Sequence, residues 1–241
     1  MSVETAILVG LSRQVALKRQ MEVVANNIAN MNTTAYRAES ILFREYLVTS
    51  PTGDKVSYVE DYGIARDLRE GAMEATSNSL DVAISGPGYF VVEGNDGPRY
   101  TRNGHLRLDD EGQLVTQDGA PLQDRDGQVI QFENPTVEVT ISRDGTITAA
   151  DGESFTLAVV SFDNEQALQK AANGLYKTDQ APTPVEAPQI LQGMLEASNV
   201  QPIVQMTRLI DIQRAYEGTQ KMMNADHDLQ RDAIGRIGRV S

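Results

Sequence analysis

The hydrophobic pattern at the N-terminal end of the chain is that of a long helix. From residue 3 to residue 31 there is neither proline nor an aromatic residue, and apolar positions recur at steps of four and three. This spacing places them on one face of an α-helix. The stripe consists of Leu17, Met21, Val24, Ile28 and Met31, extended by Ile7, Leu8, Leu11 and Val15. It stops at Asn32, a residue type that tolerates a left-handed helix end. The pattern therefore predicts a helix over residues 1–34.

A second helical pattern occupies the C-terminal end. Ser198 and Asn199 are good N-cap residues, and Pro202 falls in the first turn, where its missing N–H costs nothing. The apolar residues that keep a heptad register are Leu209, Ile212, Tyr216 and Met223. We expect a helix over residues 199–241, of which roughly 36 helical residues would span about 54 Å. Because long amphipathic helices are marginal alone, each terminal helix must bury its stripe against the other or against another chain.

Glycine-rich turns divide the middle of the chain into short strands. Fourteen of the 19 glycines lie between Gly53 and Gly174, and they separate runs of strand-forming residues. The turn dipeptides are Asp96-Gly97, Asn103-Gly104, Asp118-Gly119, Asp126-Gly127 and Asp144-Gly145. Many short strands with close turns predict a compact antiparallel β domain over residues 76–178.

Two further segments connect this β domain to the helices. Three prolines within residues 179–198 favour extended backbone, so this stretch is expected to be an extended return segment. Residues 35–75 are less patterned and are expected to be an extended connector. The resulting fold class is α+β, with long N- and C-terminal helices packed as a coiled-coil-like pair and a central antiparallel β domain inserted between them.

Charge and composition narrow the choice of partners. The formal net charge is -13, of which residues 41–192 carry -14 while the two ends are nearly neutral. Nucleic acid is not expected as a partner, because phosphate binding needs clustered Lys and Arg. The chain has no cysteine, so disulfides and thiolate chemistry are absent. The apolar run from Ala6 to Val9 is too short for a signal peptide or a membrane span, so we expect no membrane insertion, and any export must use another route.

The sequence nominates no catalytic residue, metal ligand or cofactor site. The two histidines, His105 and His227, fall in different predicted elements and fit surface positions. Asp124 and Asp126 suggest a calcium loop, but Gly127 comes at the fourth position rather than the sixth. The stretch Gly86-Pro87-Gly88 lacks the lysine of a phosphate-binding loop. We therefore expect no enzyme activity, no cofactor and no small-molecule substrate.

Polar residues on the predicted helices are candidates for contacts between subunits. Three asparagines lie about one turn apart near the end of the first helix, where asparagine is unfavourable, and they fit either a fraying end or hydrogen bonds between packed helices. Gln213, Arg214 and Glu217 fit either contacts that hold the register between chains or an ordinary exposed face. The expected interface residues are Asn26, Asn27, Ile28, Asn30, Leu209, Ile210, Ile212, Gln213, Tyr216 and Met223.

Several motifs occur along the chain in a distinctive order. The N-terminal ones are Val24-Ala25-Asn26-Asn27-Ile28-Ala29-Asn30 and Asn32-Thr33-Thr34-Ala35-Tyr36-Arg37. The central ones include Leu80-Asp81-Val82-Ala83-Ile84, Gly88-Tyr89-Phe90-Val91-Val92 and Tyr100-Thr101-Arg102-Asn103-Gly104. The C-terminal ones are Gly193-Met194-Leu195-Glu196-Ala197-Ser198-Asn199-Val200 and Gln213-Arg214-Ala215-Tyr216-Glu217. Together these motifs resemble the axial proteins of the bacterial flagellum, the family of rod and hook subunits. One departure is Ala35, where the family commonly has glycine.

The resemblance implies a structural subunit of the flagellar basal-body rod. Such subunits leave the cytoplasm unfolded through the flagellum-specific type III export apparatus, without a cleaved signal peptide. They assemble with copies of themselves and with other rod proteins into a helical tube across the periplasm, with the terminal helices lining the inner tube. The modest length and the stretch Val9-Gly10-Leu11-Ser12-Arg13-Gln14 are most similar to proximal rod subunits, and distal rod subunits are the close alternative.

Two other functions remain open at the level of the sequence. One is a periplasmic wall hydrolase that uses two carboxylates in the β domain. The other is a fibre subunit of a phage tail or an adhesin, which deletion would separate from a rod subunit because only the rod is needed for motility.

Overall fold

The structure, a computed structural model, describes residues 3–49, 55–94, 96–134 and 137–237. The predictions for residues 1–2 and 238–241, at the ends of the two expected helices, lie outside the described residues. So do residues 50–54 of the expected connector, and residues 95 and 135–136 of the expected β domain.

The chain forms two compact units. Unit 1 consists of Met1–Ala29, Ala38–Asp67 and Gln201–Ser241, and unit 2 of Asn30–Arg37 and Leu68–Val200. Unit 1 contains α1 (Val3–Ala29), β1 (Glu39–Thr49), β2 (Lys55–Arg66) and α2 (Pro202–Ile237). Unit 2 contains β3 (Met73–Ala75), β4 (Val82–Ser85), β5 (Tyr89–Val92), β6 (Arg99–Thr101), β7 (Leu106–Leu108), β8 (Leu114–Thr116), β9 (Val139–Ile141), β10 (Thr146–Ala149), β11 (Ser154–Thr156), β12 (Val159–Ser161), η1 (Glu165–Ala167), β13 (Gln169–Lys170), η2 (Ala172–Gly174), β14 (Tyr176–Lys177), β15 (Thr183–Pro184), β16 (Gln189–Gln192) and β17 (Met194–Glu196).

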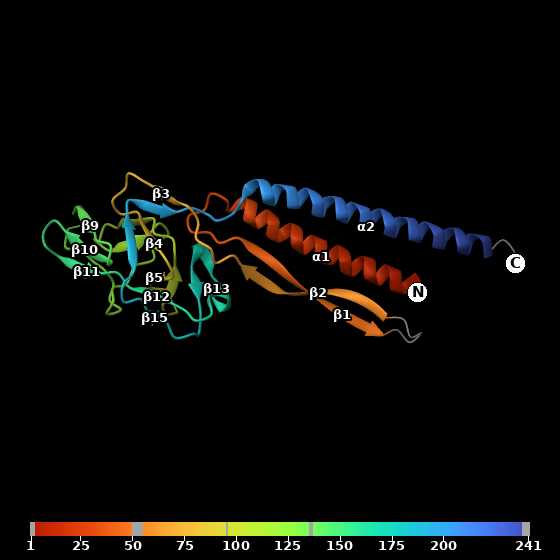
Figure 1. Ribbon diagram of the computed structural model, residues 1–241, viewed down its shortest axis with the longest axis horizontal. Helices are drawn as coiled ribbons and strands as arrows, with labels where there is room; N and C mark the ends of the chain where they lie inside the picture. The colour runs from red at the N-terminus through yellow and green to blue at the C-terminus, as the bar shows by residue number, and fades with distance from the viewer. Residues whose placement is uncertain (1–2, 50–54, 95, 135–136, 238–241) are drawn as a thin grey trace. The chain divides into compact units, whose positions relative to one another are not determined.

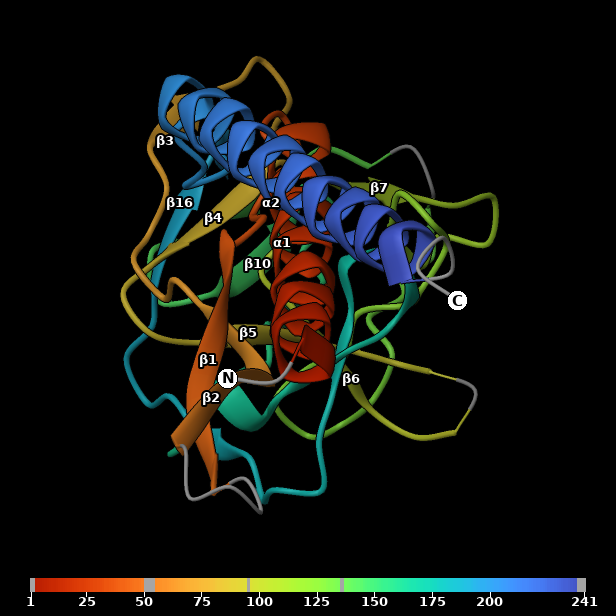
Figure 2. The same ribbon diagram turned by 90° about the vertical axis from the view of Figure 1, so that its right-hand side faces the viewer.

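In unit 1, α1 packs against α2 and also against the β1–β2 hairpin (Figure 1). Gly10 lies against Met223, and Asn27 reaches Gln205, so the two helices run antiparallel. The end-on view of Figure 2 shows them side by side. The hairpin strands pair from Glu39 opposite Arg66 to Thr49 opposite Lys55, with a register shift after Leu42. Because a two-stranded hairpin is marginal alone, its packing on α1 supplies stability that its ladder does not.

Asn27 joins three elements of unit 1. Its side-chain Nδ2 donates to the carbonyl oxygen of Glu39 at 2.7 Å, and its Oδ1 accepts from the Glu39 N–H at 2.9 Å. The same Nδ2 lies 3.5 Å from the Gln205 Oε1 on α2. The Asn27 side chain is 1% exposed, so these polar atoms would be costly to leave unpaired. One amide on α1 therefore fixes where β1 starts and where α2 crosses.

The expected fold class was wrong in its coiled-coil-like helix pair. A coiled-coil seam needs a repeating line of apolar side chains. In unit 1 the helices meet through polar side chains as well: Gln14 is hydrogen-bonded to Gln220, and Gln205 and Thr219 are buried on α2. The face of α1 is also shared with a β-hairpin, which lies within residues 35–75. The two terminal helices and the antiparallel strands between them fit an α+β class.

Unit 2 is built from short antiparallel strands around two hydrophobic clusters. The six-stranded sheet has the order β13-β14-β6-β5-β12-β15, and a three-stranded sheet has the order β11-β10-β9. Along β5, Phe90 and Val92 enter the larger cluster, while Tyr89 and Val91 enter the smaller one. This alternation follows from the two-residue period of a strand. The six-stranded sheet thus has a hydrophobic layer on each face.

The smaller cluster is aromatic and contains a buried hydroxyl. Tyr89 packs edge-on against Tyr176, and Tyr100 against Phe162. The Tyr89 hydroxyl donates to the Glu165 carboxylate at 2.7 Å. Burial raises the pKa of Tyr89 well above its ordinary value, and the neighbouring Glu165 raises it further. The hydroxyl therefore stays protonated and serves as a fixed donor inside unit 2.

The backbone at Ala35 generates the first prediction. Ala35 has φ of 57°, a left-handed conformation in which its Cβ is strained, and its N–H donates to the carbonyl of Glu196 at 2.7 Å. Because glycine adopts this conformation freely, Ala35→Gly should raise the free energy of unfolding by about 1 kcal/mol. Thermal unfolding followed by circular dichroism measures the change. The control is Ala171→Gly in the same unit, where φ is -108° and glycine should lower the melting temperature. A lower melting temperature for Ala35→Gly would contradict the prediction.

Candidate assembly surface

Three charged side chains from distant motifs meet inside unit 2. Arg37 ends the N-terminal motif, Arg102 belongs to a central motif and Glu196 to the C-terminal motif. Their side chains are 5%, 4% and 1% exposed. The Glu196 carboxylate accepts from an Arg37 Nη atom at 3.1 Å through one oxygen and from the Arg102 Nε at 2.7 Å through the other. The segments that carry the family resemblance are thus joined by a buried ion network.

Backbone carbonyl groups add hydrogen bonds to this network, although the buried Nε of Arg37 has no partner among the described residues. Arg102 donates through its two Nη atoms to the carbonyl oxygens of Ile84, Gly86 and Gly88, each at 2.9 Å. Arg37 donates to the carbonyl of Leu68. Burying ions costs several kcal/mol each, and such a group is tolerated only when additional hydrogen bonds satisfy the charges. The guanidinium of Arg102 meets that condition, so it holds three backbone positions around β4 and β5 as well as the carboxylate.

Backbone hydrogen bonds join the same segments. The Asn199 N–H donates to the Tyr36 carbonyl at 3.3 Å, and its side-chain amide donates to the Arg69 carbonyl at 2.8 Å. The Gly71 N–H donates to the Glu196 carboxylate at 3.2 Å. A Cβ on Gly71 would lie 1.8 Å from the Ala197 carbonyl oxygen, so only glycine fits there. These contacts hold the N-terminal, connector and return segments of unit 2 together.

The network yields the second prediction. Glu196→Gln removes the charge that lies between two buried guanidinium groups while keeping the side chain's shape. We expect the free energy of unfolding to fall by about 3–5 kcal/mol, the usual cost of leaving a buried charge without its partner. Urea unfolding followed by circular dichroism measures it. Glu186→Gln, an exposed control in the same unit, should change stability by less than about 0.5 kcal/mol. Equal stability of the two variants would show that the network contributes no net stabilisation.

Unit 1 carries nearly all the large apolar side chains that are exposed. Among the described residues, unit 2 contributes only Leu68 to this group. The members in unit 1 are Leu8, Leu11, Val15, Leu42, Tyr46, Tyr62, Ile64, Ile203, Val204, Met206, Ile210, Met222 and Leu229. Monomeric proteins rarely expose large contiguous apolar patches, and such patches mark interaction surfaces. The helices and the hairpin of unit 1 are therefore the candidate assembly surface.

The net negative charge is concentrated in unit 2, whereas the exposed apolar side chains are concentrated in unit 1. Unit 2 has 9 basic and 21 acidic residues, a net charge of -12, whereas unit 1 has 12 basic and 13 acidic residues, a net charge of -1. Copies of a strongly acidic unit repel one another and stay hydrated, while a nearly neutral unit can approach its copies closely. The low net charge and the exposed apolar side chains both mark unit 1 as the candidate assembly surface.

The ten residues expected at a subunit interface are divided by the structure. Asn26, Ile210 and Gln213 are exposed on the helices. Asn27 is buried in the intramolecular contact with Glu39 described above. The remaining members are half-buried: Ile28, Asn30, Leu209, Ile212, Tyr216 and Met223. The first three are accessible to another chain, and the others help to pack this one.

Sequence reasoning missed two features. It did not single out Arg37, Arg102 and Glu196, although a charged residue inside an otherwise apolar motif, as in Gly193-Met194-Leu195-Glu196-Ala197, was a usable signal. It also did not assign the hairpin, because β1 and β2 are long strands without the short turn spacing seen in the middle of the chain.

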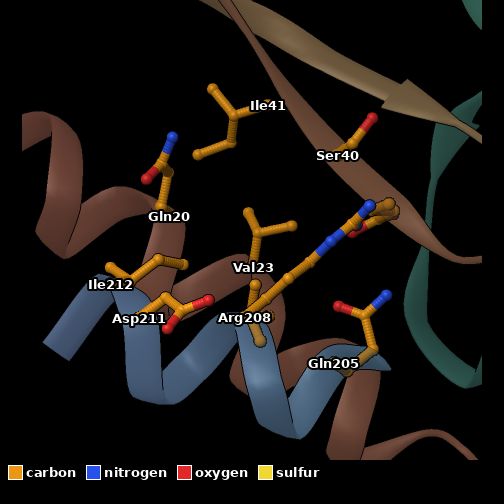
Figure 3. A pocket seen from close by; sticks show the side chains of 10 residues that line it. Gln20, Val23, Ser40, Ile41, Gln205, Arg208, Asp211 and Ile212 are labelled. Carbon is orange, nitrogen blue, oxygen red and sulfur yellow. The ribbon is translucent and has the colours of Figure 1, made fainter. Parts of the chain in front are cut away.

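A cavity of about 320 Å³ lies between α1, α2 and β1 in unit 1. Figure 3 shows Gln20 and Val23 from α1, Ile41 from β1, and Arg208 and Asp211 from α2 around it. Four of its ten lining residues are aliphatic, and the other six are charged, amide or hydroxyl residues.

Outside the buried ion network, the side chains of His105 and Asp81 form a hydrogen-bonded pair. His105 lies 2.6 Å from the Asp81 carboxylate, which also accepts from the Asn78 amide at 2.9 Å. Across the described parts of the chain, no cluster of His, Cys, Asp and Glu side chains is arranged to hold a metal ion. Nor does any helix within those parts combine the length and the apolar character that crossing a bilayer requires.

Family models match three parts of the chain, which contain Arg37, Arg102 and Glu196 respectively. Residues 7–37 match the flagella basal body rod protein family, residues 83–149 the D1 domain of the flagellar hook protein FlgE/F/G family, and residues 191–236 the C-terminal region of the flagellar basal body rod FlgEFG proteins. A flagellar basal-body rod protein FlgF of Caulobacter vibrioides is 42% identical, over 99% of this chain and 100% of the relative. The chain belongs to the flagellar basal-body rod protein family. The resemblance inferred from the motifs is thereby confirmed.

Other members of the family are more distant. A rod protein FlgF of Rhizobium meliloti is 33% identical, over 98% of both chains. A rod protein FlgG of Bacillus subtilis is 27% identical, over 93% of this chain and 96% of the relative. The similarity is therefore greater to rod proteins of the FlgF kind, as the N-terminal motif suggested, and the FlgG alternative is less favoured. In all three relatives the similarity runs through both units.

Proposed function

We propose that the chain is a structural subunit of the proximal part of the flagellar rod and that it polymerises through unit 1. The observation that carries the proposal is the concentration of exposed large apolar side chains in unit 1, in a chain whose similarity to an FlgF rod protein covers 99% of its length. Its partners are copies of itself and other rod proteins. The names of the relatives favour this role over a wall hydrolase or a fibre subunit.

In this proposal the chain has no catalytic role and takes no cofactor, nucleic acid or small-molecule substrate. It reaches the periplasm through the type III export apparatus of the flagellum, without a cleaved signal peptide. Unit 1 contributes to the packed wall of the rod, and the acidic unit 2 faces water. The exposed members of the expected interface, Asn26, Ile210 and Gln213, contact neighbouring subunits.

The test of this function is removal of the gene followed by repair with single variants. Deletion should leave cells without external filaments and unable to swim, and the wild-type gene should restore both. Ile210→Asp places a charge on an exposed apolar position, so it should leave the fold and export intact but lose the subunit from purified basal bodies. Electron microscopy, swimming assays and immunoblots of basal bodies measure these outcomes.

The matched control adds the same charge to the acidic unit. Gln117→Asp, at an exposed position of unit 2, should assemble and swim like the wild type. Normal swimming of the deletion strain would refute the rod function. Wild-type amounts of Ile210→Asp in basal bodies would refute the role of unit 1.

A further inference from the structure

Each terminal helix has a second apolar face that its own chain does not cover. On α1 this face consists of Leu8, Leu11 and Val15, which are 52%, 49% and 62% exposed. On α2 it consists of Ile203, Met206 and Ile210, which are 81%, 48% and 50% exposed. Both sets follow the spacing i, i+3, i+7, so each forms one continuous ridge about two turns long. We call them the α1 triplet and the α2 triplet.

The two triplets lie in segments with the same residue pattern. The segments are Leu8-Val9-Gly10-Leu11-Ser12-Arg13-Gln14-Val15 and Ile203-Val204-Gln205-Met206-Thr207-Arg208-Leu209-Ile210. In both, a hydroxyl residue and an arginine follow the middle apolar residue. Matching size, spacing and polar borders mean that one ridge can pack against the other over its full length.

Each triplet lies on a different side of its helix from the residues that pack most deeply within the chain, although the exposed hydrogen bond between Gln14 and Gln220 is only about a quarter of a turn from each triplet. At about 100° per residue, Gly10 and Asn27 lie more than about a third of a turn round α1 from the middle of its triplet. Gln205, Thr219 and Met223 lie equally far round α2 from its own triplet. Those five residues face the partner helix or the hairpin or are buried. A triplet is therefore free to meet another molecule while the pair stays packed.

The triplets also lie at opposite ends of the helix pair. Gly10 lies against Met223, and Asn27 against Gln205, so Leu11 is level with a position near residue 222 of the same chain. Met206 is 16 residues from that position, which corresponds to roughly 24 Å along the helix. A disulfide needs two Cα atoms within about 7 Å of each other. Cysteines placed in the two triplets of one chain would therefore be too far apart to form a disulfide with each other.

We propose that the α1 triplet of one copy packs against the α2 triplet of a second copy, an inference that rests on the proposed rod function. In antiparallel packing Leu8 lies near Ile210, Leu11 near Met206 and Val15 near Ile203. Arg13 then lies opposite Gln205 and Arg208 opposite Gly10, so the two cations do not face each other. In this contact Leu11 of one copy lies level with Met206 of the next copy, whereas within one chain Leu11 lies level with position 222. Neighbouring copies are therefore displaced by roughly 24 Å along the helices.

This contact is heterologous, and repetition of one such contact builds an open helical array. It buries both triplets of every interior copy. Pairing α1 with α1 and α2 with α2 would need two different contacts, each with its own two-fold axis. The second copy is therefore favoured as the partner by the similarity of the two ridges and by the single repeating contact that they allow.

Engineered disulfides test the pairing cleanly because the chain has no cysteine of its own. The variant Leu11→Cys/Met206→Cys is expressed from its own locus, and oxidised basal bodies are separated on a non-reducing gel. We expect the chain to shift to twice and three times the monomer mass, and reduction to reverse the shift. Mixed expression of the two single variants should give the dimer alone. The control Leu11→Cys/Asp211→Cys places the second thiol about 100° or more away around α2 and should stay monomeric.

Every outcome decides between the alternatives. Crosslinking of Leu11→Cys by itself shows two-fold pairing of α1 and overturns the proposal, as does a crosslink to a different protein. A monomeric double-cysteine variant in basal bodies of swimming cells also overturns it, while leaving the rod function intact. If the cysteine variants do not assemble, charge exchange is used instead: Leu11→Glu and Met206→Lys should each abolish swimming, and their combination should restore it. Absence of that rescue overturns the pairing.

Discussion

The buried contact of Glu196 with Arg37 and Arg102 holds unit 2 to a single arrangement of its segments. Arg102 and Glu196 are 94 positions apart in the chain, and the Arg102 Nε donates a 2.7 Å hydrogen bond to the Glu196 carboxylate. Since a buried charge without a partner is expensive, any path of the chain that separated these residues would be strongly disfavoured. The strands around β4 and β5, the turn at Ala35 and the return segment all take their places from this constraint.

A second contact, smaller but similar in kind, organises unit 1. The Asn27 side-chain amide is hydrogen-bonded to both the N–H and the carbonyl oxygen of Glu39, as a neighbouring strand would be. It also contacts Gln205. This explains why asparagine is found near the end of α1 despite its poor helix propensity, because its side chain replaces backbone partners that the start of β1 would otherwise lack. Polar contacts of this type fix the helix pair and the hairpin without a continuous apolar seam.

That polar seam has a consequence for assembly. If the helices buried all their apolar residues against each other, the chain would be self-contained and the outer faces would be polar. Instead, part of the intramolecular contact is made by Gln14, Asn27, Gln205 and Gln220, and apolar ridges remain on the outside. A subunit of a polymer needs this division, since the free energy of burying the outer ridges becomes available only when another chain arrives.

Much about this protein was determined by the sequence alone. Periodicity near 3.6 placed both long helices, Asp-Gly dipeptides marked turns in the β region, and Gly97, Gly119, Gly127 and Gly145 do adopt positive φ. The ordered motifs identified the family. These signals are local, because each depends on residues within one or two turns of each other. The tertiary structure alone decided that the helix seam is partly polar, that β1 and β2 form a hairpin on α1, and that Arg37, Arg102 and Glu196 meet. A contact between residues so far apart depends on the path of the whole chain, to which neighbouring residues contribute no periodic signal.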